Sequence, residues 1–134
     1  MLRILVVDDN MANRQFLVEL LSEKAQCECA SGGRAAVQAY QASITEKEPF
    51  DLILLDIAMP EVDGLEVLGA IRETEKKAGV TLGEGLPIIM ATAHEQPFMK
   101  AFNSGCDDYV LKPIDPDELF RKIDNVLKAR GRLR

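Results

Sequence analysis

The chain has 134 residues, 47% of them hydrophobic, which fits one compact domain and leaves little room for a second. A net charge of -6 argues against a surface built to bind nucleic acid. No apolar run approaches the roughly 20 residues of a membrane-spanning helix, and no signal-peptide cleavage site follows the apolar start. Its three cysteines, an odd number, favour reduced thiols over a disulfide framework. We therefore expect a cytoplasmic protein.

Short β-rich runs alternate with longer segments whose apolar residues recur at helical spacing. The strands are expected at 2–7, 27–30, 52–55, 88–91 and 109–111. The helices are expected near 12–23, 34–44, 65–79, 97–103 and 116–130. Five such units predict an open parallel sheet of the α/β class with helices on both faces.

The last helix has the clearest start. Asp115 is the expected N-cap, Pro116 suits the first helical position, and Glu118 completes a capping-box pattern. Gly131 is expected to end this helix. The Gly-rich stretch 79–87 predicts a surface loop before the fourth strand.

Polar side chains follow four of the five predicted strands. Asp8 and Asp9 follow the first, Asp56 the third, Thr92 the fourth and Lys112 the fifth. Because ligands bind outside the carboxyl ends of parallel strands, we expect these side chains to converge. Clustered carboxylates repel one another, and a hard cation such as Mg²⁺ offsets that repulsion. A carboxylate can also attack phosphorus, while a lysine and a hydroxyl neutralise the phosphoryl oxygens.

Five motifs, in the same order along the chain, resemble those of response-regulator receiver domains. They are residues 6–10, 54–60, 63–64, 90–93 and 108–113. The resemblance covers essentially the whole chain and implies a doubly wound (βα)5 sandwich. Its five-stranded parallel sheet would have the flavodoxin-like order 2-1-3-4-5. Residues 1–130 would form the receiver domain, and 131–134 a basic C-terminal tail.

The resemblance also implies a role for each residue of the acidic cluster. Asp56 would accept the phosphoryl group and contribute to the metal site. Asp9 would bind Mg²⁺ directly, while Asp8 would support the ion largely through water. The backbone carbonyl of Ala58 would be a further protein ligand.

The remaining motif residues would carry the signal. Lys112, next to a cis peptide bond to Pro113, would bridge the phosphoryl group and the acidic cluster. Thr92 would move toward the phosphoryl oxygen, and Tyr109 would then turn inward, although Tyr109 could equally be a core aromatic of its strand. His94 occupies a position that tunes the phosphoryl lifetime in the family.

The implied partners are a histidine kinase or histidine phosphotransfer protein as phosphodonor, and an effector that binds the face formed by the fourth helix, fifth strand and fifth helix. The domain would be a signalling phosphoacceptor that assists only its own phosphorylation and dephosphorylation, and not an enzyme. It would contact neither DNA nor membrane directly. The basic tail needs no partner, because cations at a helix C-terminus complement its dipole.

Three alternatives stay open at this point. The chain could be a receiver domain cut from a hybrid histidine kinase or a longer regulator. It could be a small aspartate-nucleophile phosphatase, although Ala58 stands where such enzymes have a second acid. It could be a flavin-binding electron carrier, although the acidic pair at 8–9 would repel a flavin phosphate.

Overall fold

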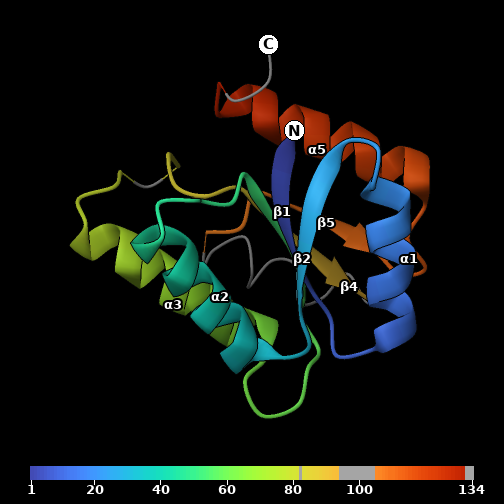
Figure 1. The fold of residues 1–134 in the computed structure, drawn as a ribbon, viewed down its shortest axis with the longest axis horizontal. Coiled ribbons are helices and arrows are strands. Elements are labelled where there is room, and N and C mark those ends of the chain that lie inside the picture. Colours follow the sequence, from blue (N-terminus) through green and yellow to red (C-terminus); the bar gives the residue numbers. More distant parts are fainter. Residues whose placement is uncertain (82, 94–104, 132–134) are drawn as a thin grey trace.

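The computed structural model describes residues 1–81, 83–93 and 105–131, and its sheet has five parallel strands in the order β2-β1-β3-β4-β5 (Figure 1). The strands are β1 Leu2–Val7, β2 Ala25–Ala30, β3 Leu52–Asp56, β4 Ile88–Thr92 and β5 Asp108–Leu111. The helices are α1 Met11–Leu21, α2 Gly33–Thr45, α3 Gly64–Lys77 and α5 Pro116–Ala129. The predicted architecture and strand order are confirmed. The helix predicted at 97–103 and residues 132–134 of the tail lie outside the described residues, among which no helix could cross a membrane.

Two apolar layers enclose the sheet because successive strand side chains point to opposite faces. In β1, Leu5 and Val7 join the core under α2 and α3, while Ile4 and Val6 join the core under α1 and α5. All four side chains are buried. The central strands β1, β3 and β4 therefore read as largely apolar runs, as expected of a parallel sheet covered on both faces (Figure 1).

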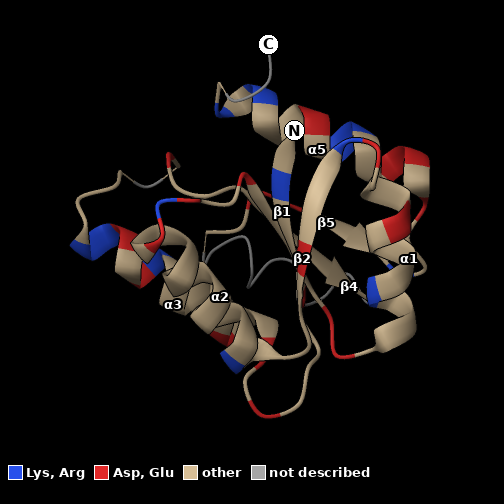
Figure 2. Ribbon diagram, in the orientation of Figure 1, with Lys and Arg blue, Asp and Glu red and all other residues tan. Residues whose placement is uncertain are grey.

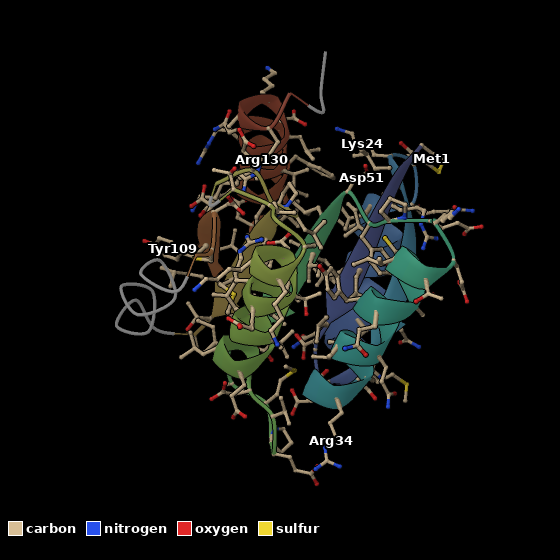
Figure 3. The ribbon with its side chains drawn as sticks, turned by 90° about the vertical axis from the view of Figure 1, so that its left-hand side faces the viewer. Met1, Lys24, Arg34, Asp51, Tyr109 and Arg130 are labelled. Atoms are coloured by element: carbon tan, nitrogen blue, oxygen red, sulfur yellow. The ribbon has the colours of Figure 1, made fainter. Side chains whose placement is uncertain are left out.

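The carboxyl and amino edges of the sheet, formed by the two ends of its parallel strands, carry different loops and charged residues. The β1–α1 turn and the β3–α3 loop lie together at the carboxyl edge, and Figure 2 shows acidic residues in both. Figure 3 shows Arg34 toward this end of the molecule, with Met1, Asp51 and Arg130 at the opposite end. The candidate site residues were predicted at the carboxyl edge, and the loops there bring acidic groups into one region.

The helix caps differ in part from those predicted. Asp115 does cap α5, but its carboxylate accepts from the Asp117 N–H at 3.1 Å. The Glu118 carboxylate pairs with Lys122 at 3.1 Å and does not close a capping box, because an ammonium lies one helical turn further on. Gly131, with a φ of +71°, follows the end of α5 as predicted.

A complete capping box instead opens α3. The Asp63 carboxylate accepts from the Glu66 N–H at 2.9 Å, and the Glu66 carboxylate accepts from the Asp63 N–H at 3.5 Å. This box fixes the start of α3 at the end of the loop that follows Asp56. It therefore helps to position the carboxyl edge of β3.

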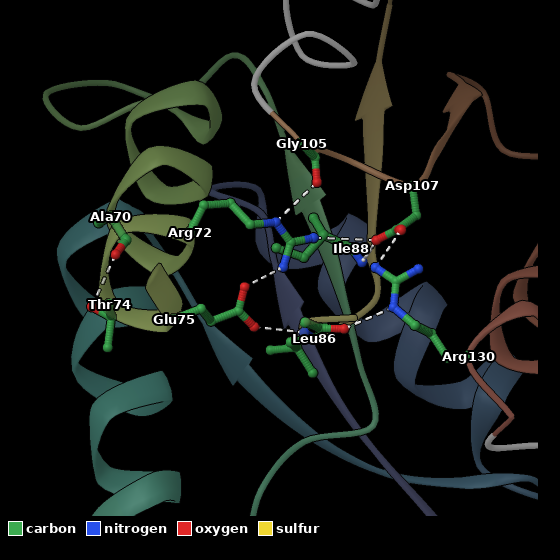
Figure 4. Close-up of polar contacts among 10 residues, drawn as sticks. Ala70, Arg72, Thr74, Glu75, Leu86, Ile88, Gly105, Asp107 and Arg130 are labelled. Atoms are coloured by element: carbon green, nitrogen blue, oxygen red, sulfur yellow. Dashed lines mark hydrogen bonds and ion pairs between the residues drawn. The ribbon is translucent and has the colours of Figure 1, made fainter. Parts of the chain in front are cut away.

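A largely buried charge network at the amino edge joins elements that are far apart in the sequence (Figure 4). Its centre is Asp107, directly before β5. The Asp107 carboxylate lies 3.2 Å from Arg72 of α3 and 2.6 Å from Arg130 at the end of α5. It also accepts from the Ile88 N–H at 2.8 Å, where β4 begins. One carboxylate thus links both flanking helices to two strands.

The two arginines extend this network into the neighbouring loops (Figure 4). Arg72 donates to the Gly105 carbonyl at 2.9 Å and pairs with Glu75 at 2.7 Å. Glu75 in turn accepts from the Leu86 N–H, at 2.6 Å, and Arg130 donates to the Gly85 carbonyl at 2.9 Å. Buried charges of this kind stabilise only when every member is paired.

Replacement of Asp107 by alanine should therefore be strongly destabilising, because two largely buried guanidinium groups would lose their shared carboxylate. We expect Asp107→Ala to lower the free energy of unfolding by about 3 kcal/mol in urea titrations. Asp124→Ala is the matched control on the exposed surface of α5 and should change it by less than about 0.5 kcal/mol. Equal effects of the two substitutions would contradict a structural role for the network.

Candidate functional site

Three carboxylates meet at the carboxyl edge of the sheet. Asp8 follows β1 and is 3% exposed, Asp56 ends β3 and is 4% exposed, and Asp9 is exposed. One carboxylate oxygen from each lies within 4.8 Å of the others. Two of the acids are thus buried, and the third lies at the solvent side of the cluster.

Lys112 is the cation that contacts the two buried acids. Its Nζ lies 3.1 Å from an Asp8 oxygen and 3.1 Å from an Asp56 oxygen. The lysine directly follows β5, and its backbone N–H donates to the Thr92 carbonyl at 2.8 Å. The peptide bond between Lys112 and Pro113 is cis. The lysine after the fifth strand therefore places its ammonium between the carboxylates at the ends of the first and the third strands.

The cluster perturbs the ionisation of Asp56 and Lys112. Burial raises the pKa of Asp56, and the hydrogen bond and positive charge of Lys112 offset only part of that effect. Burial alone would lower the pKa of Lys112, but Asp56 and Asp8 outweigh it and raise this pKa. The charged form of Asp56 is therefore costly in its pocket, and added positive charge beside it would be favourable.

Backbone and side-chain donors hold Asp8 in place. Its carboxylate accepts from the Asn10 N–H at 2.9 Å and from the Asn13 side-chain amide at 3.3 Å. Arg14 donates to the Asp8 carbonyl at 2.8 Å. Asn10 also caps α1. The sequence interpretation did not identify Asn13 and Arg14, which lie in the first turn of α1, next to the acidic pair.

The loop after Asp56 is fixed by close backbone packing. The Ala58 N–H donates to the Asp56 carboxylate at 3.3 Å, and Ala58 itself is exposed. The Gly64 N–H donates to the Ile57 carbonyl at 2.9 Å. A Cβ on Gly64 would lie 2.3 Å from the Asp56 carbonyl oxygen, so only glycine fits there. Gly64 thus sets the path of the chain beside Asp56. The sequence analysis identified it only as part of the motif at 63–64.

Thr92 and Tyr109 lie on the two strands beyond β3. Asp56 aligns with Ala91 in the sheet, so Thr92 extends one residue further along the same edge, where it is buried. Tyr109 aligns with Met90 and is half-buried against the α2 and α3 side of the core. His94 lies outside the described residues.

Comparison with known families assigns the chain as a whole. The sequence profile of the response regulator receiver domain matches residues 4–124. The chain belongs to this family. It is therefore a receiver domain of two-component signalling, as the resemblance implied.

Known proteins that contain similar domains differ in size. An uncharacterised 14.6 kDa protein of Leptolyngbya boryana is 39% identical, over 94% of this chain and 90% of its own length. Hybrid signal transduction histidine kinase I of Dictyostelium discoideum is 38% identical over 91% of this chain. That match spans only 7% of the kinase. Receiver domains similar to this chain thus occur both in small proteins and as short parts of large kinases.

Solved structures agree with the fold. The receiver domain of Ssk1 from Saccharomyces cerevisiae, solved with the histidine phosphotransfer protein Ypd1, superposes with a TM-score of 0.80. The two chains are 29% identical, over 96% of this chain and 91% of that one. These comparisons do not favour the phosphatase alternative.

Substitution of Gly64 tests the close packing beside Asp56. We expect Gly64→Ala to lower the free energy of unfolding by about 2 kcal/mol, because the added Cβ would force backbone atoms apart. Gly69→Ala is the matched control in α3, where an added Cβ meets nothing within 4 Å. That control should raise stability by up to about 1 kcal/mol, the helix-propensity gain. Urea titrations would measure both, and a Gly64 variant as stable as wild type would contradict the packing argument.

Proposed function

We propose that this receiver domain accepts a phosphoryl group on Asp56, in a reaction that depends on Mg²⁺. The observation that carries the proposal is the buried Asp56 carboxylate, which has a raised pKa, pairs with Lys112 and lies within 4.8 Å of two further acids. Its position at the carboxyl edge is where an open α/β sheet binds its ligands. The domain would act as a phosphoacceptor that assists only its own phosphorylation and dephosphorylation, and not as an enzyme on other substrates.

The acidic cluster suits a divalent cation. Lys112 supplies one positive charge against three carboxylates whose oxygens lie within 4.8 Å of one another. Mg²⁺ prefers oxygen ligands, and usually binds one or two carboxylates together with phosphate oxygens and water. We propose Asp9, Asp56 and the Ala58 carbonyl as ligands, with Asp8 supporting through water. When bound, the ion would neutralise negative charge on the transferring phosphoryl group.

Each residue has a defined part in the transfer. An Asp56 carboxylate oxygen forms the new bond to phosphorus while the bond from phosphorus to the donor's histidine nitrogen breaks. Lys112, which the raised pKa keeps protonated, pairs with a phosphoryl oxygen. Thr92 then offers its hydroxyl to another oxygen, and Tyr109 turns inward. Such transfer depends mainly on positioning and charge neutralisation, which this arrangement of fixed groups can supply.

The partners follow from the family. We propose a histidine kinase or histidine phosphotransfer protein as donor, in line with the phosphotransfer protein bound to the similar Ssk1 receiver. We propose that an effector protein binds the face of α5, β5 and the segment 97–103, which lies outside the described residues. Direct binding to DNA or membrane is not part of the proposal. Three free cysteines are typical of a reducing compartment, so we place the relay in the cytoplasm.

The proposed domain boundary is 1–130, with 131–134 as a basic tail, and the family match over 4–124 supports it. The same domain could work in a small protein or as part of a larger regulator. Relatives of both kinds exist, so the activity of any larger protein is a separate question.

Phosphorylation itself tests the central proposal. Incubation with Mg²⁺ and acetyl phosphate should add one phosphoryl group, detected by intact-mass spectrometry. Asp56→Asn should abolish the added mass, because an amide is not a nucleophile toward phosphorus. Asp51→Asn, at the opposite edge of the sheet, is the control and should be labelled like wild type. Equal labelling of wild type and the Asp56 variant would refute the assignment.

The metal site has its own test. Asp9→Asn should weaken Mg²⁺ binding at least about tenfold, because it removes a charged oxygen ligand. It should not lower the melting temperature without metal, since it also relieves repulsion within the cluster. Glu23→Gln, an exposed acid beyond the end of α1, is the control. Calorimetric titration with MgCl₂ measures the affinities, and unchanged affinity in the Asp9 variant would rule out its role as a ligand.

A further inference from the structure

Lys122, on α5, makes an unusual set of contacts for a lysine. Its side chain is only 17% exposed, whereas most lysines extend into solvent. The ammonium pairs with Glu118 at 3.1 Å and approaches Asp108 at 3.7 Å. It also donates to the backbone carbonyl of Tyr109. Lys122 thus bridges α5 and β5, the two described elements of the proposed effector face.

The same ammonium lies over an aromatic ring. Lys122 Nζ is 4.6 Å from the centre of the Tyr109 ring, within the range of a cation–π contact. The Asp108 carboxylate that approaches Lys122 also accepts the Tyr109 N–H at 2.8 Å. The backbone and the ring of Tyr109 are therefore both held from one cluster, formed by Asp108, Glu118 and Lys122.

This cluster is connected to the phosphoacceptor site through β5. Tyr109 precedes Lys112 by three residues, and Lys112 contacts Asp56 directly. The Tyr109 ring is half-buried where it meets Lys122. An inward turn of the ring, as the proposed function requires, would bury the ring further. It would take the ring away from the Lys122 ammonium, and the loss of that contact opposes the turn.

We propose that Lys122 is a positioning residue that sets how readily Tyr109 turns inward. Its cation favours the ring position seen here, and Asp108 and Glu118 hold the ammonium where it can do so. Lys122 would thereby set the threshold at which a phosphoryl group on Asp56 changes the β5–α5 face. The inference rests on the proposed function, since it concerns the response to a group bound at Asp56.

Because the chain has few aromatic residues, the Tyr109 ring can be observed directly by NMR. The sequence has two tyrosines and no tryptophan. Incorporation of 3-fluorotyrosine should give two ¹⁹F resonances, which Tyr40→Phe assigns. Tyr40 is a buried residue of α2 and serves as an internal reference. Titration with beryllofluoride, which mimics the phosphoryl group, in the presence of Mg²⁺ should then shift the Tyr109 resonance.

Three substitutions separate the cation from the rest of the side chain. Lys122→Met and Lys122→Gln both remove the charge, and glutamine keeps an N–H donor for the Tyr109 carbonyl. We expect each to lower the beryllofluoride concentration at half-shift about threefold to tenfold, the range of a partly buried cation–π contact. Lys122→Arg keeps a cation that packs well on aromatic rings and should behave like wild type. Lys128→Met, an exposed lysine of the same helix, is the matched control.

The outcomes separate this inference from the proposal on which it rests. A role of Lys122 in anchoring α5 alone would change stability but leave the midpoint of the Tyr109 shift unchanged in the Met and Gln variants. That result would overturn the inference while the proposed function stood. A midpoint lowered as much by Lys122→Arg as by Lys122→Gln would also overturn it. If beryllofluoride shifted neither Tyr109 nor the amides around Asp56 in wild type, the proposed function would fail, and this inference with it.

Discussion

Electrostatic repulsion among Asp8, Asp9 and Asp56 is the constraint on which the carboxyl edge of this domain depends. Two of these acids are buried, and burial, together with the nearby Asp8 charge, raises the pKa of Asp56 although Lys112 offsets part of that effect. Lys112 is that cation for the two buried acids, but one ammonium does not balance three carboxylates. The imbalance makes the site receptive to further positive charge. Lys112 contacts both buried acids and directly follows β5, so a charged group bound there would change the electrostatic environment of this lysine.

At the amino edge of the same sheet, largely buried acids are also close to one another, but they are paired with arginines. There Asp107 and Glu75 are matched by Arg72 and Arg130, and backbone N–H groups take the remaining carboxylate contacts. Within this network two acids are matched by two bases, so these four residues carry no excess of one sign. The network ties the end of α3, the start of β4, the approach to β5 and the end of α5 together. The satisfied interactions at the amino edge thus stand against the unbalanced acidic cluster at the carboxyl edge.

The fold and the line of candidate residues could be read from the sequence because both depend on local patterns. Buried parallel strands are continuous apolar runs, and the residue that ends each run must lie at the carboxyl edge. Asp56, Thr92 and Lys112 were found in this way, without knowledge of the helix positions. The capping box was assigned to Asp115 and Glu118, whereas it lies at Asp63 and Glu66. Glu118 does not close a box with Asp115 because its carboxylate pairs with Lys122, and this pairing depends on side-chain geometry that the sequence pattern does not show.

Contacts between distant segments were beyond the reach of sequence patterns. Arg72, Asp107 and Arg130 are ordinary charged residues in the sequence, and only the closure of the sheet brings them together. Lys122 is likewise one of 16 basic residues, with no motif of its own. The contact of Lys122 with Tyr109 exists only because α5 packs against β5, which places the ammonium over the Tyr109 ring. The motif residues can be recognised from the sequence, whereas the side chains that contact them depend on how this particular chain packs. Under the proposed function, such a packing contact would set how this domain responds to a phosphoryl group on Asp56.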